Sequence, residues 1–93
     1  MNKLAFSQWS LKRIAEGKKF CTSRKRYFPD DPRVLGLVPL PWWFIRNYLY
    51  GLEGADSPEE LQSIMNQLSR RKVEDDEMFN VHFGDFRGKG GRK

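Results

Sequence analysis

The stretch GKKFCTSR, residues 17–24, lies where the sequence predicts that a helix ends and a strand begins. Ser7 is a favourable N-cap for a helix over QWSLKRIAE, residues 8–16. Gly17 fits the position just past the end of that helix, where a left-handed backbone conformation is needed. The aromatic and β-branched content of KFCTS, residues 19–23, is typical of a short strand. The eight residues therefore connect two elements of different type.

The segments on either side of this junction extend the pattern. KLAFS, residues 3–7, predicts a short opening strand before the helix. YFPDDP, residues 27–32, predicts a turn, because its prolines and aspartates disfavour regular structure. RVLGLVPL, residues 33–40, is then expected to form a buried strand that ends at Pro39.

A helix through WWFIRNYLY, residues 42–50, is predicted to follow, with Pro41 in its first turn. Adjacent residues of a helix point about 100° apart. We therefore expect that Trp42 and Trp43 do not both face the core.

SPEELQSIMNQLSRR, residues 57–71, is the clearest predicted helix. Ser57 and Glu60 match a capping box, and Pro58 suits the first helical position. The apolar residues of this segment fall on one helical stripe, which consists of Leu61, Ile64, Met65 and Leu68.

The chain closes with a strand and a basic tail. MFNVHFGDF, residues 78–86, alternates enough to predict a strand with Phe79, Val81 and Phe83 on one side. RGKGGRK, residues 87–93, has a low-complexity basic composition and is expected to be flexible.

The order of these elements predicts one α+β domain over residues 1–86, with three helices and a small curved sheet or partial β-barrel. The chain has 93 residues, of which 14% are aromatic, so one modest core is expected. One cysteine and one histidine support neither an internal disulfide nor a metal site, and no cofactor is indicated. Because the sequence has no long apolar run and no secretory signal, we expect a cytoplasmic or nuclear protein that does not enter a membrane. We also expect a monomer.

Charge is unevenly distributed along the chain. The net charge is +5, but residues 1–26 carry +7, residues 27–86 carry −6 and residues 87–93 carry +4. A basic patch built from the N-terminal third would attract a polyanion through electrostatic steering and counterion release. RNA is therefore the first partner to consider, with DNA after it. The alternative is that these lysines and arginines only solvate a small surface.

The opening stretch also carries a family resemblance. Residues 17–24 match all four fixed positions of the G-x-K-x-x-T-x-R signature of the activating-signal-cointegrator homology (ASCH) domain, namely Gly17, Lys19, Thr22 and Arg24. GLEGADSPEEL, residues 51–61, is similar to the Glu-Gly pair and capped helix of that family. The resemblance implies a barrel of the pseudouridine-synthase-and-archaeosine-transglycosylase (PUA) type, a cleft lined by the signature, and binding of RNA or modified nucleosides. Because only KRYFPDDP separates the signature from the next strand, the barrel is expected to be shortened.

Some ASCH proteins are acetylcytidine amidohydrolases, and the resemblance assigns their catalytic positions to Lys19, Thr22 and Glu53. The chemistry is reasonable, because a lysine can serve as base, a threonine hydroxyl as nucleophile and a carboxyl group as proton relay. Arg24 would hold the carbonyl oxyanion or orient Glu53. The alternative is that Lys19 and Arg24 form ordinary ion pairs while Thr22 packs in a strand.

Six residues are expected to contact nucleic acid around this cleft, namely Lys18, Arg24, Lys25, Arg26, Tyr27 and Trp43. Cations that contact phosphates and rings that stack on bases are how proteins hold single-stranded nucleic acid. We therefore predict a domain that binds single-stranded RNA or a modified nucleoside. Hydrolysis of acetylcytidine is the alternative, and ribonuclease activity is a weaker third.

Cys21 and His82 are left out of the predicted site. Alternation along a strand points Cys21 away from the side of Thr22, and a lone internal cysteine is usually part of the packing. His82 has no partner in its sequence context and is interpreted as an ordinary strand residue. EDDE, residues 74–77, lacks the ligand spacing of a calcium loop and is interpreted as a solvated turn.

Overall fold

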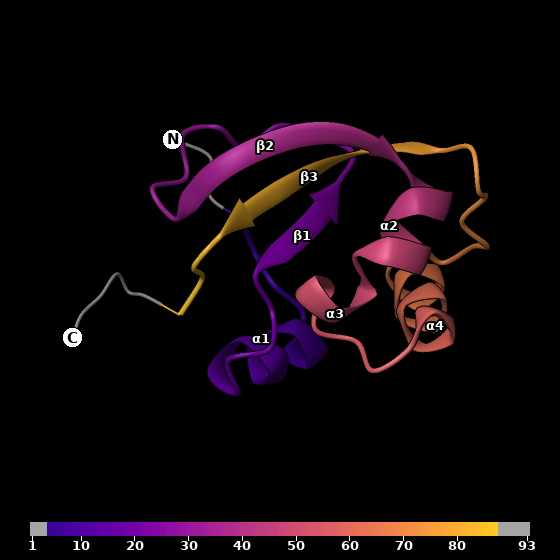
Figure 1. The fold of residues 1–93 in the computed structure, drawn as a ribbon, viewed down its shortest axis with the longest axis horizontal. Coiled ribbons are helices and arrows are strands. Elements are labelled where there is room, and N and C mark those ends of the chain that lie inside the picture. Colours follow the sequence, from indigo (N-terminus) through magenta and orange to yellow (C-terminus); the bar gives the residue numbers. More distant parts are fainter. Residues whose placement is uncertain (1–3, 88–93) are drawn as a thin grey trace.

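The computed structural model describes residues 4–87 and contains a three-stranded sheet with helices packed beside it (Figure 1). In chain order its elements are α1 (Gln8–Ala15), β1 (Cys21–Arg24), β2 (Val34–Pro41), α2 (Trp42–Tyr48), α3 (Tyr50–Glu53), α4 (Pro58–Ser69) and β3 (Met78–Gly84). The α+β class is confirmed, with four helices among the described residues where three were expected. The predicted tail, residues 87–93, lies outside the described residues except for Arg87, which pairs with Asp85 at 3.0 Å.

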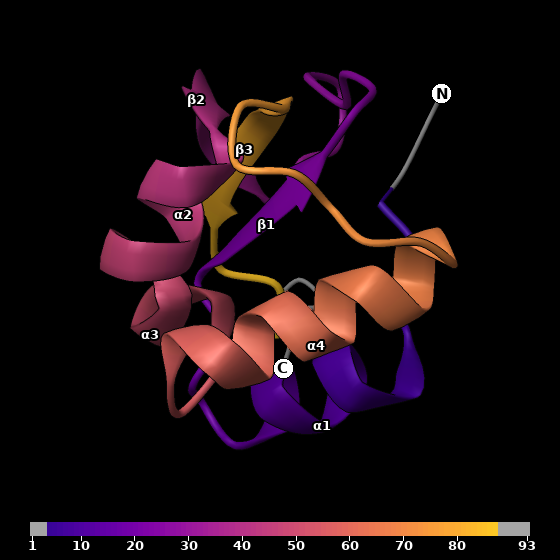
Figure 2. The same ribbon diagram turned by 90° about the vertical axis from the view of Figure 1, so that its right-hand side faces the viewer.

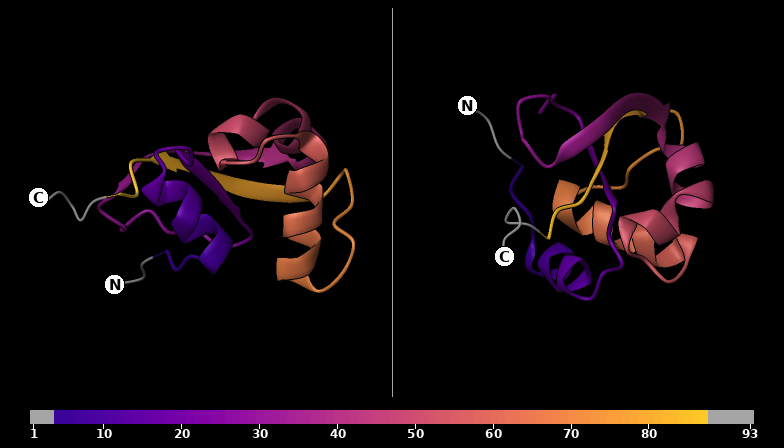
Figure 3. Two further views of the ribbon diagram at one scale, coloured as in Figure 1. Left: turned by 90° about the horizontal axis from the view of Figure 1, so that it is seen from below. Right: turned by 60° about the vertical axis from the view of Figure 1, so that its left-hand side comes forward.

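The sheet is open and antiparallel, with the strand order β1-β3-β2. β3 therefore forms the centre of the sheet, and both edge strands pair with it. In the register, Thr22 lies opposite His82 and Ser23 lies opposite Val81. The long strand β2 bows over β3 in Figure 1, and Figures 2 and 3 show the helices gathered on one side of the sheet. Side chains of β1 that point toward the helices can therefore meet residues from distant parts of the chain.

β2 differs most from its prediction. The sequence predicts a buried strand that ends at Pro39, and this is wrong, because β2 runs on to Pro41 at the edge of the sheet and leaves Leu35 83% exposed. An edge position tolerates proline, since a nitrogen that faces away from the neighbouring strand needs no hydrogen-bond partner. Pro41 is the N-cap residue of α2 and not part of its first turn.

The predicted opening strand over residues 3–7 is also wrong, since the described part of this segment has no regular structure. The backbone N–H of Leu4 donates to Oδ2 of Asp31 at 2.9 Å. The carbonyl oxygen of Ala5 accepts a bond from Nη2 of Arg24 at 2.6 Å. Side chains, and not a neighbouring strand, therefore satisfy these backbone groups.

The predicted helix over residues 42–50 divides into α2 and the single turn α3, with a break between them. Trp42 is fully buried and Trp43 is 42% exposed, which confirms that the two rings do not both face the core. The last residue of α3, Glu53, is buried. The C-cap residue that follows it is Gly54, whose φ is 102°.

The ends of α1 and α4 follow the predicted capping. The side chain of Ser7 accepts a backbone bond in the first turn of α1, and Gly17 adopts a φ of 76° just past the other end. At α4, the hydroxyl of Ser57 accepts a bond from the N–H of Glu60 at 3.1 Å. The reciprocal bond of the capping box is shifted by one residue, because the Glu60 carboxylate accepts from the N–H of Asp56.

Two clusters of buried apolar side chains form the core. The larger joins the sheet to α2 and α4 and contains Cys21, Trp42, Ile45, Ala55, Leu61, Val73, Phe79 and Val81, with Phe83 packed against it. The smaller contains Leu4, Ile14 and Phe86. The apolar stripe of α4 is only partly buried, because Leu68 is 56% exposed. Within the described residues, every helix is too short or too polar to cross a membrane.

Candidate functional site

A pocket of about 290 Å³ is formed by residues of β1, α1, α3, α4 and β3. Its polar lining comes mainly from β1 and the residues near it in space, namely Lys19, Thr22, Ser23, Arg24, Lys25 and Glu53. Its apolar lining comes mainly from α4, namely Leu61, Ile64, Met65 and Leu68. Trp9 and Phe79 add two aromatic rings. The pocket therefore offers both hydrogen-bonding groups and apolar surface to a ligand.

A buried ion pair lies in the polar part of this lining. Lys19 is 3% exposed and Glu53 is 2% exposed. Nζ of Lys19 donates to Oε1 of Glu53 at 3.0 Å and to the backbone carbonyl of the same residue at 2.9 Å. The lysine thus holds both the side chain and the backbone of the glutamate. Loss of either partner would leave a buried charge without compensation, which is strongly destabilising.

The backbone at Gly54 explains how Glu53 reaches this position. The φ of Gly54 is +102°, a conformation that residues with a side chain rarely adopt. A Cβ atom at this position would lie 2.9 Å from Cβ of Arg13 and 3.3 Å from Cβ of Lys19. Glycine therefore allows the end of α3 to approach α1 and Lys19 closely, and this approach places Glu53 in the pocket.

Ser23 is the residue of the site that the sequence reasoning missed. Its hydroxyl donates to Oε2 of Glu53 at 2.5 Å, and the residue is 5% exposed. Both carboxylate oxygens of Glu53 are therefore engaged, one by Lys19 and the other by Ser23. Strand alternation places Ser23 on the same face of β1 as the core residue Cys21 and Thr22 on the other face, but it does not indicate which face meets Glu53.

Thr22 lines the pocket without bonding to the ion pair. It is 4% exposed, and its Oγ1 accepts a bond from Nε of Arg24 at 3.3 Å. The structure thus joins Lys19 and Glu53 directly and places Thr22 in the lining of the same pocket. The hydroxyl that contacts the glutamate is that of Ser23.

Arg24 is directed inward and holds the N-terminal segment. Its Nη2 donates to the carbonyl of Ala5, and its guanidinium carbon lies 5.2 Å from the centroid of the Phe6 ring. Burial lowers the pKa of Arg24, and the nearby Glu53 carboxylate opposes this effect. Arg24 therefore contributes to the pocket lining and to the attachment of the segment before α1.

Two of the lysines predicted to contact nucleic acid are paired with acids. Nζ of Lys18 lies 3.8 Å from Oε1 of Glu16. Nζ of Lys25 lies 3.1 Å from Oε1 of Glu77 and 4.4 Å from the centroid of the Phe79 ring. The positive charge of both side chains is thus partly compensated.

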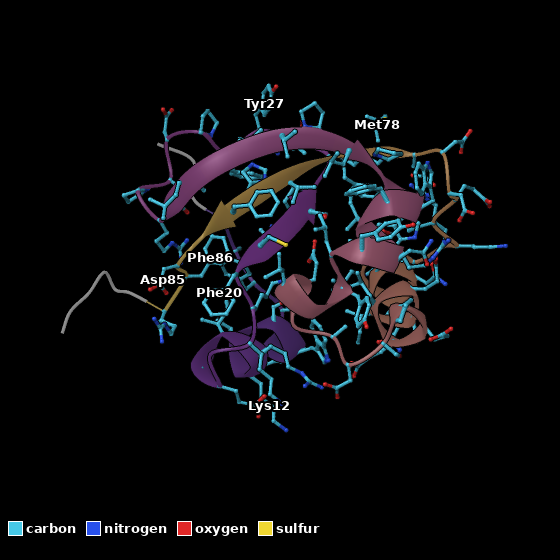
Figure 4. All side chains as sticks on the ribbon, in the orientation of Figure 1. Lys12, Phe20, Tyr27, Met78, Asp85 and Phe86 are labelled. Atoms are coloured by element: carbon cyan, nitrogen blue, oxygen red, sulfur yellow. The ribbon has the colours of Figure 1, made fainter. Side chains whose placement is uncertain are left out.

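Arg26, Tyr27 and Trp43 remain at the surface. Arg26 is exposed and has no ion pair within residues 4–87. Tyr27 is 61% exposed and points outward above β2 (Figure 4). Trp43 lies on α2 with its ring edge-on to Phe44, at 5.7 Å between centroids, and it does not line the pocket. The structure therefore separates these three residues from the lining that contains Lys19 and Glu53.

Acids from later parts of the chain pair with three of the described N-terminal cations, namely Arg13, Lys19 and Lys25. Arg13 of α1 lies 3.2 Å from Glu60 and 3.7 Å from Asp56. Among the described cations before residue 27, those without an ion pair are Lys12, Arg24 and Arg26. Lys12 points away from α1 in Figure 4. Contacts with later acids therefore offset part of the charge asymmetry of the sequence.

Cys21 and His82 are both fully buried. Burial, to which the charge of Glu53 adds, raises the pKa of the Cys21 thiol far above its usual range. Nε2 of His82 accepts a bond from the N–H of Phe28 at 3.1 Å, and burial lowers the pKa of this imidazole. Within residues 4–87, no three side chains of the His, Cys, Asp or Glu type cluster as metal ligands.

Comparison of the chain with known protein families, with curated proteins and with solved structures yields no match. The pocket and its contacts are therefore the basis on which a function can be proposed, and the resemblance to ASCH domains stays a hypothesis.

Proposed function

We propose that the pocket binds a nucleobase or nucleoside, either free or presented by single-stranded RNA. The observation that carries the proposal is the pocket itself, with a volume of about 290 Å³ and a lining that is polar in one part and apolar and aromatic in another. Pockets for small molecules typically have such a lining and a volume that begins near this value. A nucleobase has a polar edge and apolar faces, so it suits both parts of the lining.

The proposal includes a relationship to the ASCH domains and a shortened PUA-like fold. It is supported by the position of the signature residues, because Lys19, Thr22 and Arg24 all line one pocket together with Glu53. These residues come from two segments that are far apart in the sequence. A ligand site built from both segments is what the resemblance implies.

Surface charge favours a ligand in the pocket over an extended polyanion on the surface. Lys18 and Lys25 lie beside carboxylates, which offset their attraction for phosphate groups. We therefore propose that an RNA ligand is held mainly by one base in the pocket. Exposed cations such as Arg26 would add a smaller, salt-dependent share of the affinity.

Hydrolysis of acetylcytidine is the second candidate, and the buried pair of Lys19 and Glu53 in the pocket favours it. Two contacts make hydrolysis a weaker candidate than binding. Lys19 is the donor in both of its bonds to Glu53, so it would have to lose a proton before it could act as a base. Thr22, the expected nucleophile, is bonded to Arg24.

The proposed function can be tested by filling the pocket. Leu68 is 56% exposed and lines the pocket, so Leu68→Trp should obstruct the ligand and weaken its binding about tenfold or more. Leu52→Trp is the matched control, because Leu52 is 43% exposed and lies outside the pocket. Isothermal titration calorimetry with cytidine and with acetylcytidine measures both variants. Equal affinity in the two variants, or no binding by the wild-type protein, would contradict the proposal.

A further inference from the structure

We propose that the hydroxyl of Ser23 is a nucleophile that accepts acyl groups, with Glu53 as its base and Lys19 as the residue that positions Glu53. The proposal concerns the same pocket but does not depend on nucleoside binding, because it assigns reactivity toward activated acyl esters as a class. It also differs from hydrolysis through Thr22 in the hydroxyl that reacts.

Three contacts in series carry this proposal. Oγ of Ser23 donates to Oε2 of Glu53 at 2.5 Å, which is the contact required between a nucleophile and its base. Oε1 of the same carboxylate accepts from Nζ of Lys19 at 3.0 Å. Lys19 is fixed in turn by its bond to the Glu53 carbonyl at 2.9 Å. A nucleophile, a base and an orienting group in this order are the parts that activate a hydroxyl for acyl transfer.

An acyl ester can approach these groups from the pocket. Ser23, Glu53 and Lys19 all belong to its lining. The α4 side chains Ile64 and Met65 line the same space and offer apolar contact to a short acyl chain. Because Lys19 uses two of its three N–H donors on Glu53, one donor is left for the oxyanion that forms during the reaction.

The proposed reaction balances without a cofactor or a redox partner. Oγ of Ser23 attacks the carbonyl carbon of the ester, and the hydroxyl proton passes to Oε2 of Glu53. The bond between the carbonyl carbon and the leaving oxygen then breaks, and the leaving group takes the proton from Glu53. Water attacks the acyl–serine ester in the second half-reaction. Glu53 accepts a proton from this water and returns it to Oγ, which releases the carboxylic acid and restores the serine.

The neighbouring nucleophiles of β1 are less well placed. Oγ1 of Thr22 accepts its bond from Arg24 and has no carboxylate partner within residues 4–87. Cys21 is fully buried, so its sulfur is not accessible from the pocket. Ser23 is therefore the residue of β1 that has a nucleophilic hydroxyl, a carboxylate base bonded to it and access from the pocket.

The test uses p-nitrophenyl acetate as the acyl donor. The folded wild-type protein is incubated with the ester and quenched in acid, and acetyl groups are located by tandem mass spectrometry. We expect acetylation of Ser23. We also expect Ser23→Ala and Glu53→Gln to release p-nitrophenol about tenfold more slowly, or slower still. Ser63→Ala, which removes an exposed serine of α4 outside this pocket, is the matched control and should react at the wild-type rate.

Circular dichroism establishes that each variant is folded, and the wild-type acetylation map decides the main point even if Glu53→Gln does not fold. Absence of acetyl from Ser23 in the folded wild-type protein would overturn the proposal. The same holds if Thr22 carries the acetyl group, or if Ser23 reacts equally well in a folded Glu53→Gln variant. Failure of nucleoside binding would be seen by calorimetry and would not change this result.

Discussion

Two neighbouring groups of residues at β1 have different environments. The pocket cluster, which consists of Lys19, Ser23 and Glu53, is at most 5% exposed, and each member bonds to another member. The surface run, which consists of Lys25, Arg26 and Tyr27, begins two residues after Ser23 and is exposed. The sequence suggested one basic cleft that contained residues of both groups. The structure divides them into a buried polar cluster and an exposed run, and Lys25 lies where the run meets the pocket lining.

The number of charged residues in the sequence therefore does not measure the charge that is available to a ligand. In the pocket cluster, the ammonium of Lys19 is compensated by Glu53 at 3.0 Å. In the surface run, the ammonium of Lys25 is compensated by Glu77 at 3.1 Å, but both side chains remain in contact with water. The buried contact holds the side chains of Lys19 and Glu53 in one arrangement, because both are buried away from the water that could replace a lost partner. The exposed contact is weakened by solvent and salt.

The largest difference between the two groups is expected when the carboxylate that pairs with the lysine of each group is replaced. Glu53→Gln leaves the Lys19 ammonium buried without its counter-charge, and we expect a loss of about 3 to 5 kcal/mol in the free energy of unfolding. Glu77→Gln is the counterpart beside the surface run, and it removes the charged contacts to Lys25 and Arg71. It should cost less than Glu53→Gln, because both cations are half exposed and water replaces the lost contacts. Urea denaturation measures both variants. Equal losses would show that the pocket cluster is not energetically distinct.

A smaller effect is expected from the glycine that places Glu53. Gly54→Ala must adopt a φ of +102° and bring a Cβ to 2.9 Å from that of Arg13, so we expect a loss of about 1 to 3 kcal/mol. Gly17→Ala is the control, because its φ is also positive but its Cβ would meet no atom within 4 Å. Thermal unfolding should show the larger decrease for Gly54→Ala. The reverse order would mean that the close approach at Gly54 does not constrain the pocket.

A third effect concerns the face of the sheet opposite the pocket cluster. The pKa of His82 is lowered mainly by burial, and backbone hydrogen bonds of Asn80 and Thr22 oppose this effect. The charge of Arg24 lowers the pKa slightly further, and the charge of Asp31 raises it. The unfolded chain, with a histidine pKa of about 6.5, therefore binds more protons than the folded chain as the pH falls below that value. We expect the free energy of unfolding to decrease from pH 7 to pH 5, a range in which ordinary carboxylates stay ionised. His82→Gln should flatten this dependence, and an unchanged slope in the variant would contradict the assignment to His82.

The smallest effect is expected in the surface run. Arg26→Ala removes one exposed cation without an ion pair among the described residues, so it should reduce the salt dependence of single-stranded RNA binding by about 0.7 in slope if one phosphate contact is lost. Filter binding at several salt concentrations measures the slope. Complete loss of RNA binding in this variant would indicate that the main RNA contact lies on the surface and not in the pocket.

The parts of the fold that were predicted correctly are those set by local sequence. Ser7 and Gly17 define the ends of α1, and Ser57 defines the start of α4, because caps depend on side chains within a few residues of the helix end. The strand β2 was predicted as buried, since its apolar composition does not reveal that it lies at a sheet edge with Leu35 exposed. Residues 3–7 were predicted as a strand from their composition. That prediction failed because the bonds that hold this segment come from Asp31 and Arg24, which are distant in the sequence.

The candidate site shows the same division between local and distant information. The resemblance selected Lys19 and Glu53 from separate segments, and the structure shows them in contact. Ser23 was missed because its role depends on which face of β1 the short helix α3 approaches. Strand alternation separates Thr22 from Ser23 but does not say which of the two meets Glu53. That choice is made by the position of α3, which no local pattern specified.

Amide chemical-shift mapping can show whether the pocket is the ligand site. Isotopically labelled protein would be titrated with cytidine and acetylcytidine and followed by two-dimensional NMR. We expect the largest shifts at Lys19, Ser23 and Glu53 and along α4, with small shifts at Arg26 and Tyr27. Shifts confined to the surface run, or no shifts at saturating ligand, would contradict the claim that this pocket binds a nucleoside.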